Sequence, residues 1–151
     1  MESSVYLGAL IGTDDEGVIE ALHSFGRSLG MAFQITDDIL GIWGLEERTG
    51  KSTLSDIKQR KKTLPIIYSL VKSEIEDRNR LLQLYACGDI TDDAVTEVTT
   101  ILDKQNALGY TQTVADQYYE EALHYLKKAG LSQGSEKELK AITKFLKDRK
   151  F

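Results

Sequence analysis

Two adjacent aspartates, Asp37 and Asp38, lie inside the apolar segment FQITDDILGIWG. Carboxylates among large apolar side chains need a cationic partner, because burying an unpaired charge is strongly unfavourable. The partner is either a Lys or Arg side chain from another helix or a metal ion. Gln34 falls on the same helical face and adds an uncharged hydrogen-bonding group. This segment is therefore the first candidate for chemistry in the chain.

A cluster of basic residues follows the two aspartates. It comprises Arg48, Lys51, Lys58, Arg60, Lys61 and Lys62 in an otherwise acidic chain. Paired carboxylates beside such cations suit a diphosphate that Mg²⁺ bridges to the carboxylates, with lysines neutralising the remaining phosphate charge. The alternative is a solvated basic turn next to a structural salt bridge. The charge pattern alone does not separate these two interpretations.

The tripeptide Thr-Asp-Asp occurs at two further places, 13–15 and 91–93. At the first, Thr13 and Glu16 have the spacing of a capping box, in which the Thr hydroxyl accepts from a backbone amide and the Glu reaches back. At the second, Thr91 precedes apolar residues at helical spacing. We expect both sites to be helix starts without catalytic roles.

The elements that hold these residues are all predicted to be helices, because apolar residues recur every three or four positions and alternating strand patterns are missing. The predicted helices are 3–12, 15–44, 53–60, 65–73, 75–87, 92–106, 109–129 and 135–148. Gly26, Gly30 and Gly41 thin the second helix and would let a neighbour or a ligand approach closely. We expect one all-α helical domain, 1–151, whose first helix has no cap and resembles the end of a longer helix.

Composition limits the partners and the compartment. The chain has 151 residues, a net charge of −5 and a pI near 5.1, which argues against nucleic-acid binding. No apolar run approaches the roughly 20 residues that span a bilayer, and the first residues do not resemble a signal peptide. We expect a cytoplasmic protein that is not inserted in membranes. Cys87 is alone, so no intramolecular disulfide is expected.

The order of several motifs resembles the trans-isoprenyl diphosphate synthases, or polyprenyl synthetases. FQITDDILG at 33–41, TGK at 49–51, Asp56 and KKTLP at 61–65 are similar to the second aspartate-rich region of that family, and LGALIG at 7–12 is similar to its preceding helix. The resemblance implies a helical bundle like the C-terminal half of the isoprenoid synthase fold. It also implies a reaction in which allylic diphosphate and isopentenyl diphosphate are joined with the help of Mg²⁺.

Site residues follow from this resemblance by position. Asp37, Asp38 and Asp56 would hold Mg²⁺, with Asp37, Asp38 and Lys51 as the catalytic set. Gln34, Lys51, Lys62 and Phe33 would contact the substrates, although Phe33 and Trp43 can equally pack in the core. The chain departs from the family pattern at two positions, where Gly41 replaces the fifth acidic residue of the motif and Ser55 replaces a glycine.

The first aspartate-rich motif of the family, with its paired arginines, is not in this sequence. We therefore expect the C-terminal half of a synthase that is poorly active alone and forms homo-oligomers, such as dimers, or associates with an N-terminal half. A second hypothesis is a non-catalytic truncated or partner subunit that acts by helix association. A third is an unrelated helical bundle with a structural salt bridge at Asp37.

Overall fold

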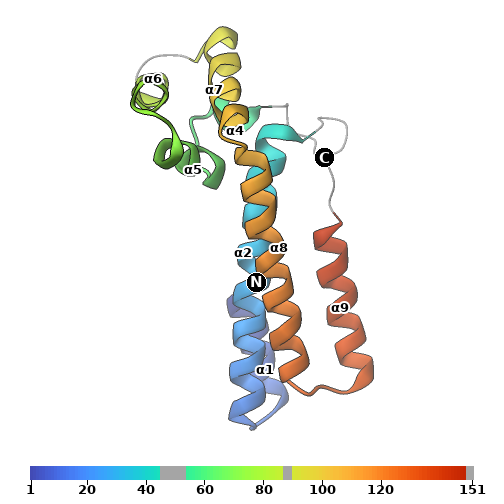
Figure 1. The fold of residues 1–151 in the computed structure, drawn as a ribbon. Coiled ribbons are helices and arrows are strands. Elements are labelled where there is room, and N and C mark those ends of the chain that lie inside the picture. The colour runs from blue at the N-terminus through green and yellow to red at the C-terminus, as the bar shows by residue number, and fades with distance from the viewer. Residues whose placement is uncertain (45–53, 87–89, 149–151) are drawn as a thin grey trace. The chain divides into compact units, whose positions relative to one another are not determined.

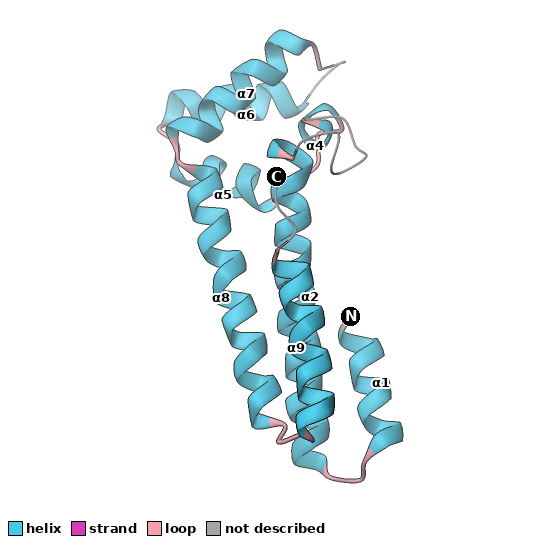
Figure 2. Ribbon diagram, turned by 90° about the vertical axis from the view of Figure 1, so that its right-hand side faces the viewer, coloured by secondary structure: helices cyan, strands magenta, loops and turns pink. Residues whose placement is uncertain are grey.

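The computed structural model of the protein describes residues 1–44, 54–86 and 90–148, and every regular element in these ranges is a helix (Figure 1). In chain order the helices are α1 (Glu2–Gly12), α2 (Glu16–Trp43), α4 (Ser55–Lys58), α5 (Leu64–Lys72), α6 (Ile75–Ala86), α7 (Asp92–Lys104), α8 (Ala107–Lys128) and α9 (Gln133–Lys147). Within the described ranges, short loops join successive helices (Figure 2). The prediction of an all-α fold is confirmed.

The contacts between residues divide the chain into two compact units. Unit 1 consists of Met1–Thr36 and Val114–Lys150, and unit 2 contains Asp37–Thr113. The helices α2 and α8 contribute residues to both units. The expectation of a single domain over 1–151 stays a prediction.

Unit 1 packs α1, the first part of α2, the later part of α8, and α9, which run alongside one another in Figures 1 and 2. Its core includes Phe25 and Leu29 from α2 with Tyr119 and Leu126 from α8, at the three- and four-residue spacing of helix faces that bury one side. At Gly26 an added Cβ would lie 2.9 Å from the Cβ of Val5. The glycine therefore permits the close approach of α1 to α2.

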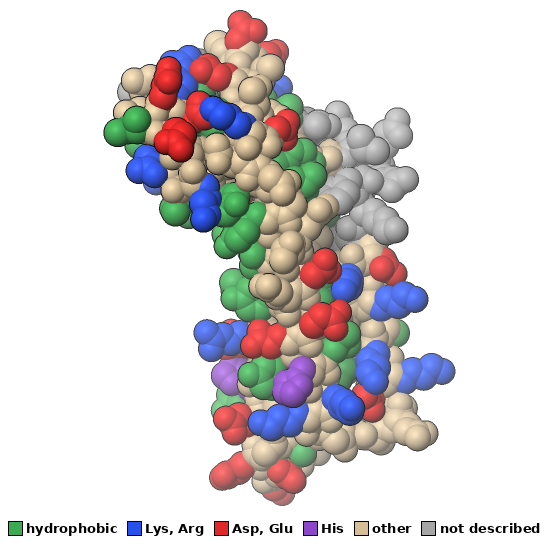
Figure 3. All heavy atoms as spheres, in the orientation of Figure 1, with side chains coloured by type: hydrophobic (Ala, Val, Ile, Leu, Met, Phe, Trp, Pro, Cys, Tyr) green, Lys and Arg blue, Asp and Glu red, His purple; other side chains and the backbone are tan. Residues whose placement is uncertain are grey.

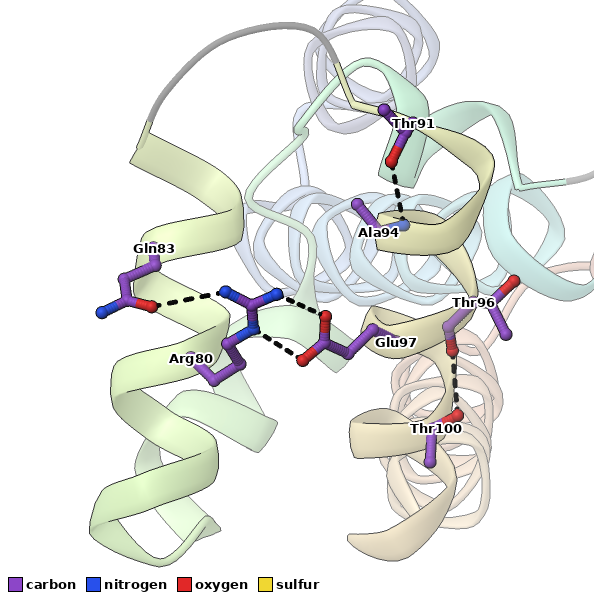
Figure 4. Close-up of polar contacts among 7 residues, drawn as sticks. All are labelled: Arg80, Gln83, Thr91, Ala94, Thr96, Glu97 and Thr100. Atoms are coloured by element: carbon purple, nitrogen blue, oxygen red, sulfur yellow. Dashed lines mark hydrogen bonds and ion pairs between the residues drawn. The ribbon is translucent and has the colours of Figure 1, made fainter.

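Unit 2 contains the end of α2, the helices α4 to α7 and the start of α8. Its core is formed by Ile42, Ile57, Ile66, Leu81, Val95, Val98, Ile101, Leu102 and Ala107. The helices α6 and α7 are also joined at the surface, where the guanidinium of Arg80 donates two hydrogen bonds to the carboxylate of Glu97, at 2.6 and 2.7 Å (Figure 4). Stacked rings of Tyr68 and Tyr110 link α5 to α8.

The two helix starts marked by Thr-Asp-Asp differ in detail. The hydroxyl of Thr91 accepts a hydrogen bond from the amide of Ala94 at 3.2 Å, so this threonine caps α7 as predicted (Figure 4). At α2 the predicted capping box is wrong. Asp15 is the capping residue, since its carboxylate accepts from the amide of Gly17 at 2.8 Å, while the Thr13 hydroxyl accepts from the amide of Asp15. A carboxylate at the cap is favoured over a hydroxyl by the helix dipole.

The surface carries charges of both signs, with Lys and Arg side chains interspersed with Asp and Glu on the face in Figure 3. Apolar side chains are also exposed on α1, where Leu7 is 57% and Ile11 is 88% exposed. No side chain caps the start of α1, as the sequence predicts. Among the described helices, none is long and apolar enough to cross a membrane.

Candidate functional site

Asp37 and Asp38 lie within the last two turns of α2, and both side chains are half-buried. Asp38 contacts the start of another helix, because its Oδ2 accepts a hydrogen bond from the amide of Leu64 at 3.1 Å. Leu64 is the first residue of α5, and Thr63 before it makes no side-chain capping bond. Asp38 therefore supplies an acceptor for an amide that has no partner within its own helix, at the positive end of that helix.

The third acidic residue, Asp56, belongs to α4 and is almost fully buried, with 5% of its side chain exposed. Its Oδ1 forms an ion pair with the Nζ of Lys61 at 2.6 Å. The hydrogen bond to Asp56 raises the pKa of Lys61 above its ordinary value, and the charges of Asp56, Asp37 and Asp38 act in the same direction. Lys61 is therefore the ion-pair partner of Asp56, and the negative charges of Asp37 and Asp38 also favour its protonated form.

The turn after α4 brings Lys61 back to Asp56. The amide of Lys61 donates to the carbonyl of Asp56 and the amide of Arg60 donates to the carbonyl of Ile57, both at 2.9 Å. This is the Schellman pattern of a helix end, with Arg60 at φ +50° in the left-handed position that glycine usually takes. Arg60 is held by a hydrogen bond from its Nε to the carbonyl of Leu84 at 3.3 Å. Both the backbone and the side chain of Lys61 consequently contact Asp56.

Gly41 lies directly against this acidic residue. A Cβ added at Gly41 would be 2.2 Å from Oδ2 and 2.3 Å from Cγ of Asp56. The hydroxyl of Ser55 also donates to the carbonyl of Gly41, in a long contact of 3.4 Å. The prediction that Gly41 permits a close approach is confirmed, and the neighbour is α4.

Tyr85 on α6 borders the same region. Its hydroxyl is buried and has no hydrogen-bond partner within the described residues. Burial raises the pKa of the Tyr85 phenol well above its ordinary value, and the charge of Asp56 adds to the effect while Arg60 opposes it. The phenol is therefore neutral at physiological pH and able to donate a hydrogen bond.

Other residues predicted for the site lie elsewhere or are not described. Lys51 lies outside the described residues. Lys62 is described and exposed, next to Lys61. Phe33 is half-buried and Gln34 exposed, and both belong to unit 1, whereas the three acidic residues belong to unit 2. The roles given to these four residues stay predictions.

Sequence reasoning gave Lys61 no role beyond its membership of the basic cluster, and it gave Tyr85 none. Lys61 was visible only as one member of a basic run, and nothing in the sequence marks the turn at Arg60 that folds it onto Asp56. Tyr85 is separated from Asp56 by almost thirty residues of helical pattern, so only the folded chain brings them together. The interaction of Asp38 with α5 was likewise not predicted.

The donor chemistry of the three carboxylates fits Mg²⁺, which prefers oxygen ligands. The described residues do not contain a group of three or more acidic, His or Cys side chains arranged to hold a metal ion by themselves. Magnesium sites of phosphate-binding proteins typically use one or two carboxylates, with water and phosphate oxygens completing the shell. Asp37, Asp38 and Asp56 fit such a shared site better than a closed protein cage.

Known proteins resemble this chain over almost its whole length. The Polyprenyl synthetase family model matches residues 1–102. A (2E,6E)-farnesyl diphosphate synthase of Mycobacterium tuberculosis is 30% identical over 99% of this chain and 42% of its own length. Component 2 of the heptaprenyl diphosphate synthase of Geobacillus stearothermophilus is 36% identical over 82% of this chain and 38% of its own.

A similar fold is found in the crystal structure of a polyprenyl synthetase from Streptomyces coelicolor A3(2). The two structures agree with a TM-score of 0.88 at 26% sequence identity, over 96% of this chain and 45% of that one. The chain thus spans less than half the length of the curated relatives it matches.

Proposed function

This chain belongs to the polyprenyl synthetase family, and from this membership we propose that it carries the second Mg²⁺–diphosphate site of a trans-prenyltransferase. The reaction joins an allylic diphosphate with isopentenyl diphosphate. The allylic C–O bond breaks and its electron pair leaves with the diphosphate. The double bond of isopentenyl diphosphate then attacks the allylic cation, and loss of a proton forms the new double bond.

The observation that supports this proposal is the ion pair of the buried Asp56 with Lys61, whose ammonium is also favoured by the negative charges of Asp37 and Asp38 at the end of α2. Together the three carboxylates carry more negative charge than this one ammonium neutralises. This charge suits a divalent cation. Bound Mg²⁺ would stabilise the negative charge that develops on the leaving diphosphate.

The residues of the chain would then have separate tasks. Asp37, Asp38 and Asp56 hold Mg²⁺, and Lys51, Lys61 and Lys62 offer ammonium groups to diphosphate oxygens. Gln34 and Phe33 contact the substrate.

Calorimetric titration with inorganic pyrophosphate tests the proposal. We expect the chain to bind pyrophosphate with Mg²⁺ present, and to lose this binding with EDTA or on the substitution Asp37→Ala. Asp93→Ala is the matched control, because it removes one negative charge from another Thr-Asp-Asp tripeptide, at the exposed start of α7. Binding that ignores Mg²⁺, or that Asp93→Ala weakens as much as Asp37→Ala, would count against the site.

A second candidate function is helix association with a partner. Leu7, Leu10 and Ile11 on α1 expose apolar surface, which protein association typically covers. The related heptaprenyl diphosphate synthase is named as having components. We propose that the chain pairs through α1 with a second copy or with a segment carrying the first aspartate-rich motif. On this proposal the chain alone forms little product from geranyl and isopentenyl diphosphates.

A further inference from the structure

A groove in unit 1 combines an apolar wall with several ammonium groups. It lies between α8 and α9 and has a volume of about 450 Å³. The residues that line it are Leu123, Lys127, Lys140, Thr143, Lys144 and Lys147. None of the described residues that are predicted for the Mg²⁺–diphosphate site lines this groove. It is therefore a separate feature of the chain.

The wall of the groove is mostly carbon. Leu123 is half-buried, and Thr143 is buried with its hydroxyl donating to the carbonyl of Leu139 at 2.9 Å. The lysines add their methylene stems, because long charged side chains lie along apolar surface while their ammonium groups reach water. The volume falls within the range of about 300–1,000 Å³ that is usual for ligand pockets. An apolar chain can therefore leave water against this wall.

The four lysines of the groove differ in their partners. Lys140 is paired with a carboxylate of α9 at 2.6 Å, and Lys147 with two carboxylates of α8 at 3.2 and 3.3 Å. Lys127 and Lys144 form no ion pair within the described part of the chain, although they line the groove from different helices. Two ammonium groups beside one apolar wall repel each other, and an anion bound between them is attracted by both.

We infer that this groove is a second binding site, independent of Mg²⁺, for an isoprenoid diphosphate. The isoprenoid chain lies against Leu123 and the lysine stems, and the diphosphate binds the ammonium groups of Lys127 and Lys144. A diphosphate has enough negative charge for both ammonium groups, whereas a fatty carboxylate has a single charge. The inference rests on the proposed function for the choice of an isoprenoid ligand.

The first experiment compares ligands by calorimetric titration in EDTA, below the critical micelle concentration. Farnesyl diphosphate is expected to bind at least about tenfold more tightly than farnesol, which lacks the charge, and than inorganic pyrophosphate, which lacks the chain. Dodecanoate tests the alternative of a fatty carboxylate and is expected to bind more weakly than farnesyl diphosphate. Absence of farnesyl diphosphate binding, or binding of farnesol or dodecanoate that is equally tight, overturns the inference.

The second experiment reverses the charges that face the ligand. Lys127→Glu with Lys144→Glu is expected to weaken farnesyl diphosphate binding in EDTA by at least about tenfold. Lys128→Glu with Lys137→Glu is the matched control, because it makes the same charge change on the same two helices, at exposed lysines outside the groove. Equal losses in the two proteins overturn the inference. If the reversed protein does not fold, Lys127→Gln with Lys144→Gln takes its place, and the same comparison decides.

The third experiment separates the groove from the proposed Mg²⁺ site. In EDTA, Asp37→Ala is expected to bind farnesyl diphosphate as tightly as the wild type does, and a loss of this binding overturns the inference. With Mg²⁺, the protein with Lys127→Glu and Lys144→Glu is expected to bind inorganic pyrophosphate as the wild type does. If the wild type does not bind pyrophosphate with Mg²⁺, the proposed function fails, and the titrations in EDTA still decide whether the groove binds.

Discussion

Lys61 is the residue whose removal tests the acidic cluster most directly. Asp56 is 5% exposed and has Lys61 as its ion-pair partner, so Lys61→Met leaves a buried carboxylate without this bond. We expect the free energy of unfolding to fall by about 1–3 kcal/mol in urea denaturation at neutral pH. Lys62→Met removes the same charge from the exposed neighbouring residue and should change stability by less than about 0.5 kcal/mol. Equal effects of the two substitutions would contradict the structure.

The same ion pair predicts a pH dependence. Because the pKa of Lys61 is raised in the folded protein, the folded state holds the proton more tightly than the unfolded chain does. The stabilisation is complete below the ordinary value of 10.5 and is lost as the pH rises through the higher folded value. The stability difference between wild type and Lys61→Met should therefore be constant between about pH 7 and 9 and decrease above 10.5. A difference that stays constant beyond that value would refute this account.

The residue types singled out part of the candidate site, and the part that they missed has a clear physical cause. Asp37 and Asp38 were singled out by their apolar setting and Asp56 by the family motif, and their roles stay predictions. The partner role of Lys61 depends on Arg60 adopting a left-handed backbone, which few residues other than glycine adopt and which no pattern indicates. The contact of Asp56 with Gly41 depends on how α4 packs against α2, and local sequence patterns do not predict that packing.

At the scale of the element, α5 takes its cap from a different helix. Asp38→Ala removes the acceptor for the Leu64 amide, and we expect a loss of about 1 kcal/mol, comparable with other lost caps. Hydrogen exchange at the Leu64 amide should become faster, while the amide of Ala94, capped by Thr91, should be unaffected. Thr91→Ala should show the opposite pattern. Unchanged exchange at Leu64 would show that Asp38 does not cap α5.

The helices themselves were largely predictable. The predicted helix 15–44 agrees with α2 at Glu16–Trp43, and the predicted helix 92–106 agrees with α7 at Asp92–Lys104. Both segments carry clear apolar periodicity and begin at a Thr-Asp-Asp tripeptide, which is a recognisable helix start. The predicted helix 53–60 has only α4, Ser55–Lys58, as its described counterpart, since the left-handed residues Leu54 and Arg60 bound it. The sequence does not show whether Thr13 or Asp15 caps α2, because both residue types are common at the N-cap.

At the scale of the whole molecule, the exposed residues of α1 predict association. We expect light scattering to show dimers or larger assemblies at micromolar concentrations. Removing the exposed apolar side chains of Leu7 and Ile11 from water lowers the free energy of the assembled state. The double substitution Leu7→Glu and Ile11→Glu should shift the protein towards the monomer and leave the helical circular dichroism unchanged. Ile75→Glu, at a residue 74% exposed at the start of α6, is the matched control. A monomeric wild type would contradict this prediction.

The turn between Asp56 and Lys61 also limits how the segment can vary in length. Its two backbone hydrogen bonds and its ion pair all span fixed intervals of the chain, so one inserted or deleted residue would disrupt them together. Residues 58 and 59 are exposed, and their side chains can change without disturbing those contacts. We therefore expect positions 58 and 59 to accept substitutions, and the stretch from Asp56 to Lys61 to accept almost no insertions or deletions.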